Sequence, residues 1–173
     1  ISSTQNYIFS NVTDLSLIIN QIWSVDLIKN LSIIVNLSSL DKLKLMFRSN
    51  LKILSLDAGA KILFNQASNL RSIEIECNFA TMGMLDINDI ISKLPLHVKR
   101  LETRLHYLEP ARMILERVEY LSFVTFHVPE RYEFWNGIVE WLTKSGRKAT
   151  IQDEPDPDHY CSIAFCSYNV HVV

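Results

Sequence analysis

The stretch Leu70-Arg71-Ser72-Ile73-Glu74-Ile75 places apolar residues at its first, fourth and sixth positions, with polar residues between them. Ile73 and Ile75 alternate with polar neighbours, and this period of two is typical of a β-strand that buries one face. The same 1, 4, 6 pattern begins at residues 12, 40, 70, 98 and 121, at intervals of 28, 30, 28 and 23 residues. This spacing indicates an internal repeat, and we expect one short strand at each start.

Segments with the helical spacing of apolar residues lie between these strands. They cover residues 22–35, 54–67, 87–94, 110–118 and 132–143. Pro110 fits the first turn of a helix, Asp86 with Asp89 resembles an N-terminal cap, and Lys144 with Gly146 fits a helix C-terminus. The alternation predicts an α/β chain of about five strand–helix units with parallel strands.

The distribution of polar residues on the strands decides between two α/β architectures. A doubly wound sheet has helices on both faces and strands that are apolar on both sides. Here one side of the predicted strands carries Lys44, Glu74, Glu102 and Thr125. We therefore expect the helices on one face only, as in a solenoid with the strands on its concave face and the helices on its convex face.

Two local features qualify this scheme. Residues 51–56 also fit the 1, 4, 6 pattern but begin only 11 residues after Leu40, so we prefer a helix from Leu54 and keep an extra strand or a loop as the alternative. In the segment 132–143 we expect one broad apolar stripe that packs in the core, formed by Phe134, Trp135, Ile138, Val139, Trp141 and Leu142.

Composition and charge narrow the class of protein. The 173 residues are 48% hydrophobic and 21% charged, with 4 Gly and 5 Pro, which favours one packed domain. We assign residues 1–146 to the repeats and 147–173 to a C-terminal capping segment, with strands at 148–152 and 160–165 around an acidic loop at 153–158. The 17 basic and 19 acidic residues are spread along the chain, so we do not expect a nucleic-acid partner.

Other totals bear on location and chemistry. No stretch reaches the roughly 18 apolar residues of a membrane span, and Cys77, Cys161 and Cys166 form no CxxC pair, so we expect a cytoplasmic or nuclear protein without a membrane partner. No nucleotide-binding, nucleophile-elbow or zinc-protease motif occurs, and we expect neither a cofactor nor a metal. His159 and Cys161 lie near Asp156 and Asp158, which we interpret as a solvated acidic loop.

Two units carry the pattern further. Residues 12–22 add Asn20 at position nine and Ile22 at position eleven, and residues 70–80 add Asn78 and Ala80. This pattern resembles the leucine-rich repeat, whose asparagine satisfies backbone groups where the strand turns toward the helix. The resemblance covers residues 12 to about 145. The repeats are degenerate, because position nine of the other units is Arg48, His106 or Pro129.

The resemblance implies a function. Irregular repeats of this kind occur in the substrate-binding parts of F-box proteins, although an F-box itself is not visible in this chain. We expect a non-catalytic protein–protein interaction module, with substrate recognition in an F-box type of ubiquitin ligase as its more specific form. The predicted binding residues lie on the strand face opposite the helices, and the oligomeric state is left open. They are Lys42, Lys44, Arg71, Glu74, Arg100, Glu102, Phe123 and Thr125.

Two other classes of function stay open at this point. A small α/β enzyme would place its site at the C-terminal ends of the strands, where His106 or His127 would lie just past a strand. A structural subunit of a larger assembly would expose an apolar patch at residues 6–10 or at the C-terminal strand.

Overall fold

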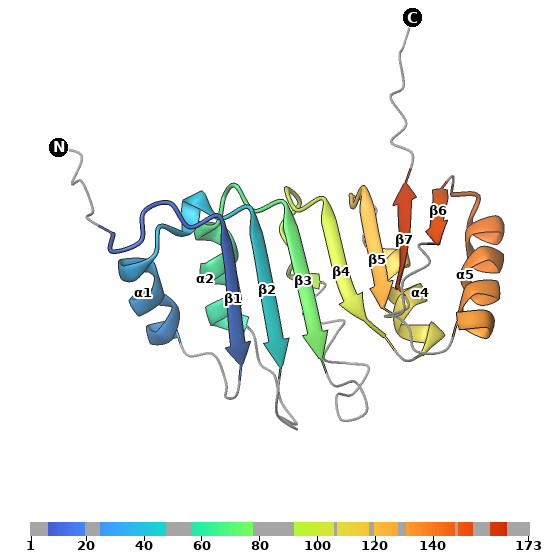
Figure 1. Ribbon diagram of the computed structural model, residues 1–173, viewed down its shortest axis with the longest axis horizontal. Coiled ribbons are helices and arrows are strands. Elements are labelled where there is room, and N and C mark those ends of the chain that lie inside the picture. Colours follow the sequence, from blue (N-terminus) through green and yellow to red (C-terminus); the bar gives the residue numbers. More distant parts are fainter. Residues whose placement is uncertain are drawn as a thin grey trace, which may run out of the picture.

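The strands of this chain form one open, mostly parallel sheet, as the computed structural model in Figure 1 shows. The structure describes residues 7–19, 25–47, 57–77, 92–105, 107–117, 120–127, 131–147, 149–153 and 160–165. Within these residues there are seven strands, four α-helices and one short 3-10 helix. The fold is therefore α/β, as the alternating pattern predicts.

The strand and helix bounds follow the predicted repeat. The strands are β1 Asp14–Ile19, β2 Lys42–Phe47, β3 Ser72–Cys77, β4 Arg100–Arg104, β5 Phe123–His127, β6 Ala149–Asp153 and β7 Tyr160–Phe165. The helices are α1 Val25–Ile34, α2 Asp57–Gln66, α4 Leu108–Arg117 and α5 Arg131–Ser145, and the 3-10 helix η1 is Leu37–Ser39. All five repeat strands and both C-terminal strands are confirmed.

Strand order in the sheet is β1-β2-β3-β4-β5-β7-β6. The first five strands are parallel and keep the order of the chain, whereas β7 runs antiparallel to both β5 and β6. Among the first five strands, those that are successive in sequence therefore lie side by side, and helices α1, α2 and α4 lie in the connections from β1 to β2, β2 to β3 and β4 to β5.

The same backbone arrangement recurs where each parallel strand begins. The carbonyl oxygen of Thr13 accepts hydrogen bonds from the amides of Asp41 and Lys42, at 2.8 and 3.0 Å. The carbonyl of Asp41 accepts from residues 71 and 72, that of Arg71 from residues 99 and 100, and that of Lys99 from residues 122 and 123. Four successive junctions thus have one geometry, so the sequence repeat is also a structural repeat.

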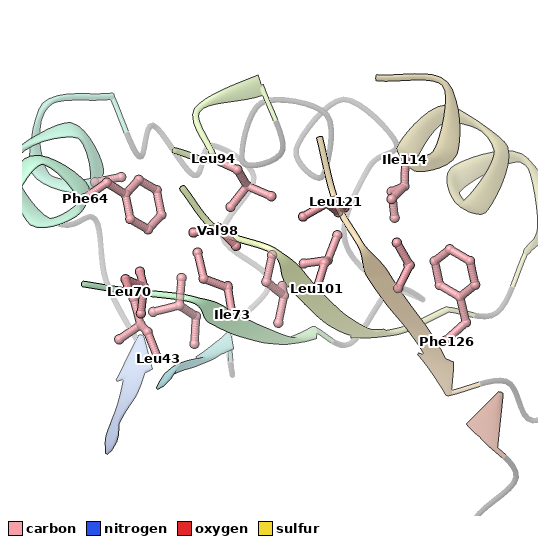
Figure 2. Close-up of a cluster of buried hydrophobic side chains, with 14 of the residues drawn as sticks. Leu43, Phe64, Leu70, Ile73, Leu94, Val98, Leu101, Ile114, Leu121 and Phe126 are labelled. Atoms are coloured by element: carbon pink, nitrogen blue, oxygen red, sulfur yellow. The ribbon is translucent and has the colours of Figure 1, made fainter. Parts of the chain in front are cut away.

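One face of the sheet packs on the helices. Alternate residues of the strands, such as Leu43 and Leu45 of β2, are fully buried. They belong to one buried cluster that also contains Leu63 of α2 and Ile114 of α4, and Figure 2 shows strand side chains pointing toward these two helices. The core thus lies between the sheet and the helices, and Figure 1 views the opposite face, in front of which no described helix lies.

Helix ends follow the expected chemistry. Gly146 has a φ of 68°, the left-handed conformation that glycine adopts most readily just past a helix. Pro110 lies in the first turn of α4, but that helix begins two residues earlier than predicted, at Leu108. The helix predicted from residue 132 begins at Arg131 and continues to Ser145.

The predicted apolar stripe of α5 is only partly correct. Phe134, Ile138 and Leu142 are buried, and the Phe134 ring meets Phe126 of β5 edge-on at 5.8 Å. Val139, however, is 46% exposed, because it lies away from the sheet on the outer side of the helix. Trp141 is half-buried, with the guanidinium of Arg147 over its ring.

Several predictions fall outside the described residues. They are the ambiguous segment 51–56, the cap at Asp86 and Asp89, most of the helix at 87–94, the acidic loop from residue 154, and Asn20 and Asn78 of the repeat motif. The helices in the described part of the chain include none with the length and apolar character that a membrane span requires.

Candidate functional site

The uncovered face of the sheet carries its side chains in three rows, because the parallel strands are in register. The first row contains Asp14, Lys42, Ser72, Arg100 and Phe123, and the second contains Ser16, Lys44, Glu74, Glu102 and Thr125. The third row lies nearest the C-terminal ends of the strands and contains Ile18, Met46, Glu76, Arg104 and His127. Seven of the eight predicted binding residues lie in the first two rows.

The eighth predicted residue, Arg71, lies at the margin of this face. It precedes β3, its side chain is 79% exposed, and its Nε lies 3.8 Å from a carboxylate oxygen of Asp41. A pair this exposed contributes little to stability. Arg71 is therefore available to a partner that reaches past the ends of the strands.

Glu74 is the centre of an ion-pair cluster between β2 and β3. Its carboxylate lies 2.9 Å from the ammonium of Lys42 and 2.5 Å from that of Lys44, which also lies 3.1 Å from Glu76. Burial raises the pKa of Glu74, but hydrogen bonds from Lys44 and Lys42 outweigh this effect and hold the pKa below its usual value. The hydrogen bond to Glu74 likewise raises the pKa values of both lysines.

A second pair of contacts links β4 and β5. The guanidinium of Arg100 lies over the Phe123 ring, 5.3 Å from its centroid, which is a cation–π geometry. Nε2 of His127 lies 2.7 Å from Oε1 of Glu102. Phe123, one of the predicted binding residues, is thus half-buried beneath an arginine of the neighbouring strand.

A pocket of about 220 Å³ lies at the C-terminal ends of β3, β4 and β5. It forms where two strands part, because the pairing of β3 with β4 ends at Ile75 and Thr103 although β3 continues to Cys77. The volume is below the roughly 300 to 1,000 Å³ of typical small-molecule sites. Its lining residues are Lys44, Glu74, Ile75, Glu76, Thr103, Arg104 and His127.

Two of these lining residues, Thr103 and Arg104, differ in how accessible their side chains are. Thr103 is 1% exposed, and its hydroxyl has no hydrogen-bond partner in the described part of the structure. Arg104 is exposed and forms no ion pair with any described carboxylate. Among the described residues, the pocket therefore offers the guanidinium of Arg104, which has no carboxylate partner there, whereas the Thr103 side chain lies on the opposite, buried face of β4.

Glu76, Arg104 and His127 were not among the predicted binding residues. The 1, 4, 6 pattern ends at its sixth position, whereas the strands continue beyond it, to Cys77 in β3 and to His127 in β5. Extending the alternation by one more step would have found the third row. The expectation that His127 follows a strand is wrong, since it is the last residue of β5; His106 lies outside the described residues.

Metal chemistry has no candidate site within the described ranges, where no three His, Cys, Asp or Glu residues come together. The acidic loop with His159 lies outside those ranges. No known family model matches this chain, and a search of curated proteins finds no relative.

Proposed function

We propose that this chain is a non-catalytic protein-interaction module whose uncovered sheet face binds a protein partner. The observation that carries the proposal is the asymmetry of the sheet: helices cover one face, while the other displays charged and aromatic side chains in register. Arginine and aromatic residues are enriched at protein interfaces, and Arg100 with Phe123 provides both at one place. Such a surface is already ordered before binding, which lowers the entropic cost of association.

The proposal includes a leucine-rich-repeat-like solenoid in which this face is concave. Support comes from the five parallel strands that follow chain order and from the common hydrogen-bonding pattern at their four junctions. In solenoids each repeat contacts mainly its neighbours, so the strands together form an extended binding surface. On this interpretation β6 and β7 close the C-terminal end of the repeats.

In its more specific form, the proposal makes the chain the substrate-recognition part of an F-box type of ubiquitin ligase. The support is the degenerate style of the repeats in residues 12 to about 145. The longest native form of the protein would then co-purify with a ubiquitin-ligase adaptor, and the partner on the sheet face would become ubiquitinated in its presence.

An affinity experiment with matched variants tests the proposal. The face variant combines Arg71→Ala, Arg100→Ala and Phe123→Ala, and the control variant makes a similar loss of two cations and one apolar side chain on the helices with Lys61→Ala, Lys144→Ala and Val139→Ala. We expect the wild type and the control to capture the same protein from native cells and the face variant to lose it, with all three folded by circular dichroism. Capture that is equal for all three, or lost equally from both variants, would overturn the proposal.

A second candidate function is a structural subunit, and one observation favours it. Ile8 is 72% exposed and Phe9 is 55% exposed, and Leu27, Ile33 and Ile34 of α1 add further exposed apolar surface in the same unit. Phe9 also pairs with Val35 beside the helix end, which brings the two segments together. If this surface is an assembly interface, the protein will sediment as an oligomer and a Phe9→Ser, Ile33→Ser variant as a monomer.

A further inference from the structure

The charges on the uncovered face are not evenly balanced. On β2 and β3, Lys42 and Lys44 are paired with Glu74 and Glu76. On β4, the only acidic residue of the face is Glu102, and His127 already contacts it. Arg100 and Arg104 on either side of Glu102 form no ion pair within the described part of the chain. The unneutralised positive charge of this face is therefore concentrated on one strand.

Spacing along β4 gives this charge a pattern. Arg100 and Arg104 are four residues apart on the same face of a strand, so their Cα atoms are separated by about 13 Å at the usual rise per residue. Lys99, just before the strand, adds a third cation, whose ammonium donates to the carbonyl oxygens of Leu96 and Tyr120 and forms no ion pair with a carboxylate of the described residues. The strip of Lys99, Arg100 and Arg104 is called here the β4 basic strip.

The two arginines differ in their surroundings. Arg100 lies over the Phe123 ring, which orients the guanidinium and leaves its edge to donate hydrogen bonds to a carboxylate. Arg104 lines the pocket where β3 and β4 part. A carboxylate entering this pocket would gain a bidentate contact with Arg104, which is stronger and more directional than a contact with lysine.

We propose that the β4 basic strip docks an acidic segment of a protein partner, with one carboxylate bound by Arg104 at the pocket and a second by Arg100. In an extended segment these would be acidic residues four positions apart. The residue midway between them would face Glu102 and His127 and so would be uncharged or basic. This inference rests on the proposed function, because it names the chemistry of the partner for the same face.

Acidic protein fits this surface better than nucleic acid does. A phosphate backbone is continuously negative, and it would bring charge close to Glu74, Glu76 and Glu102, which lie among or beside the cations. Repulsion of this kind disfavours binding of the wrong partner. Discrete carboxylates at a defined spacing can meet the arginines and avoid the glutamates.

The test is an NMR titration of the full chain, labelled with nitrogen-15. The probe is a capped Gly-Ser peptide with two glutamates four positions apart, and the control peptide has glutamines in their place. We expect amide shifts concentrated in β4 and β5 with the glutamate peptide, at least about tenfold weaker binding of the glutamine peptide, and loss of affinity as salt screens the charges.

Charge reversal on the protein completes the experiment. Arg104→Glu should weaken binding of the glutamate peptide by about tenfold or more, whereas Arg104→Lys should retain part of the affinity. Lys61→Glu, the same charge change on the exposed side of α2, should leave it unchanged. Any one of four results would overturn the inference. They are the absence of amide shifts at millimolar peptide, equal binding of the glutamine peptide, unchanged peptide binding by Arg104→Glu, and equal shifts with single-stranded DNA.

The two proposals fail in distinguishable ways. In one outcome, the variant of Arg71, Arg100 and Phe123 loses the partner protein, but neither Arg104→Glu nor the glutamate peptide affects its binding. This result would support the interaction module and contradict docking of an acidic segment on the β4 basic strip. If the glutamate peptide binds at β4 but no protein is captured, the result would support the β4 basic strip and contradict the interaction module.

Discussion

The ammonium of Lys44 lies 2.5 Å from the carboxylate of Glu74 and 3.1 Å from that of Glu76, so one lysine of β2 links two acidic residues of β3. This contact exists only in the observed register, which pairs Lys44 with Glu74. A slip of one residue would turn Lys44 toward the helices. The ion pairs of the uncovered face therefore support the strand register as well as forming part of the candidate binding surface.

Replacing Glu74 with glutamine should lower the free energy of unfolding by about 1 kcal/mol at neutral pH, because Lys42 and Lys44 lose a shared and partly buried partner. The pKa of Glu74 is lower in the folded chain than its ordinary value of 4.5, so its contribution is present above that pH and is lost as the pH falls below it. Urea unfolding should therefore show a difference between the two proteins at pH 7 that shrinks toward zero at pH 3.

The control for this prediction is Glu109→Gln. Glu109 forms an exposed pair with Arg112 on α4, and its loss should change the stability by less than about 0.5 kcal/mol. Equal effects of the two substitutions would mean that the Glu74 cluster contributes no more than an ordinary surface ion pair.

Phe126→Ala should destabilise the protein by about 3 to 5 kcal/mol, since it removes a fully buried ring and its edge-on contact with Phe134. Ile18→Ala removes a large apolar side chain that is 48% exposed on the uncovered face, and it should cost far less. Chemical denaturation of both variants measures the contrast. A small loss for Phe126→Ala would show that α5 does not pack on the sheet as described.

Gly137 of α5 allows α4 and α5 to approach closely. A Cβ atom at this position would lie 2.1 Å from Cδ2 of Leu108 and 3.1 Å from its Cγ, so the leucine would have to move. We expect Gly137→Ala to destabilise by about 1 kcal/mol or more through overpacking, despite the better helix propensity of alanine.

A double-mutant cycle isolates the cause. In a Leu108→Ala background the clash is absent, so adding Gly137→Ala should stabilise the helix by up to about 1 kcal/mol. Additive effects, with Gly137→Ala equally unfavourable in both backgrounds, would exclude the contact between these two residues as the reason.

Thr103→Val should raise the stability by about 1 kcal/mol, because it removes a buried hydroxyl that has no partner in the described part of the chain and keeps the shape of the side chain. The same substitution should leave binding of the glutamate peptide unchanged, because Thr103 lies on the buried face of β4. Thermal unfolding and the NMR titration measure the two effects separately, and a loss of stability would show that the hydroxyl is already satisfied.

Local patterns predict the five repeat strands well, because each core position is set by alternation within six residues. Ile73 and Ile75 are buried as the pattern requires, and Gly146 ends α5 with a positive φ. Val139 is an exception. Helical periodicity places it near the apolar stripe, but in the folded chain it is 46% exposed, whereas Phe134, Ile138 and Leu142 are buried.

The candidate site is also predictable only in part. The alternation assigns Lys44, Glu74 and Phe123 to one face without knowledge of the register, but it gives no information about which charges neutralise one another. Glu102 contacts His127, and Arg104 has no carboxylate partner among the described residues. This selection depends on side chains from strands more than twenty residues apart in sequence.

The sequence by itself determined the α/β class, the number of repeat strands, their parallel direction and the face on which the charged residues lie. These properties follow from periodicity and chain order. The tertiary structure alone decided that β3 and β4 part after Ile75 and Thr103, which creates the pocket, and that Arg100 and Arg104 of β4 form no ion pair with a described carboxylate. The physical reason is that strand separation and ion pairing are set by distances between different units, and a repeat pattern specifies only the conformation within each unit.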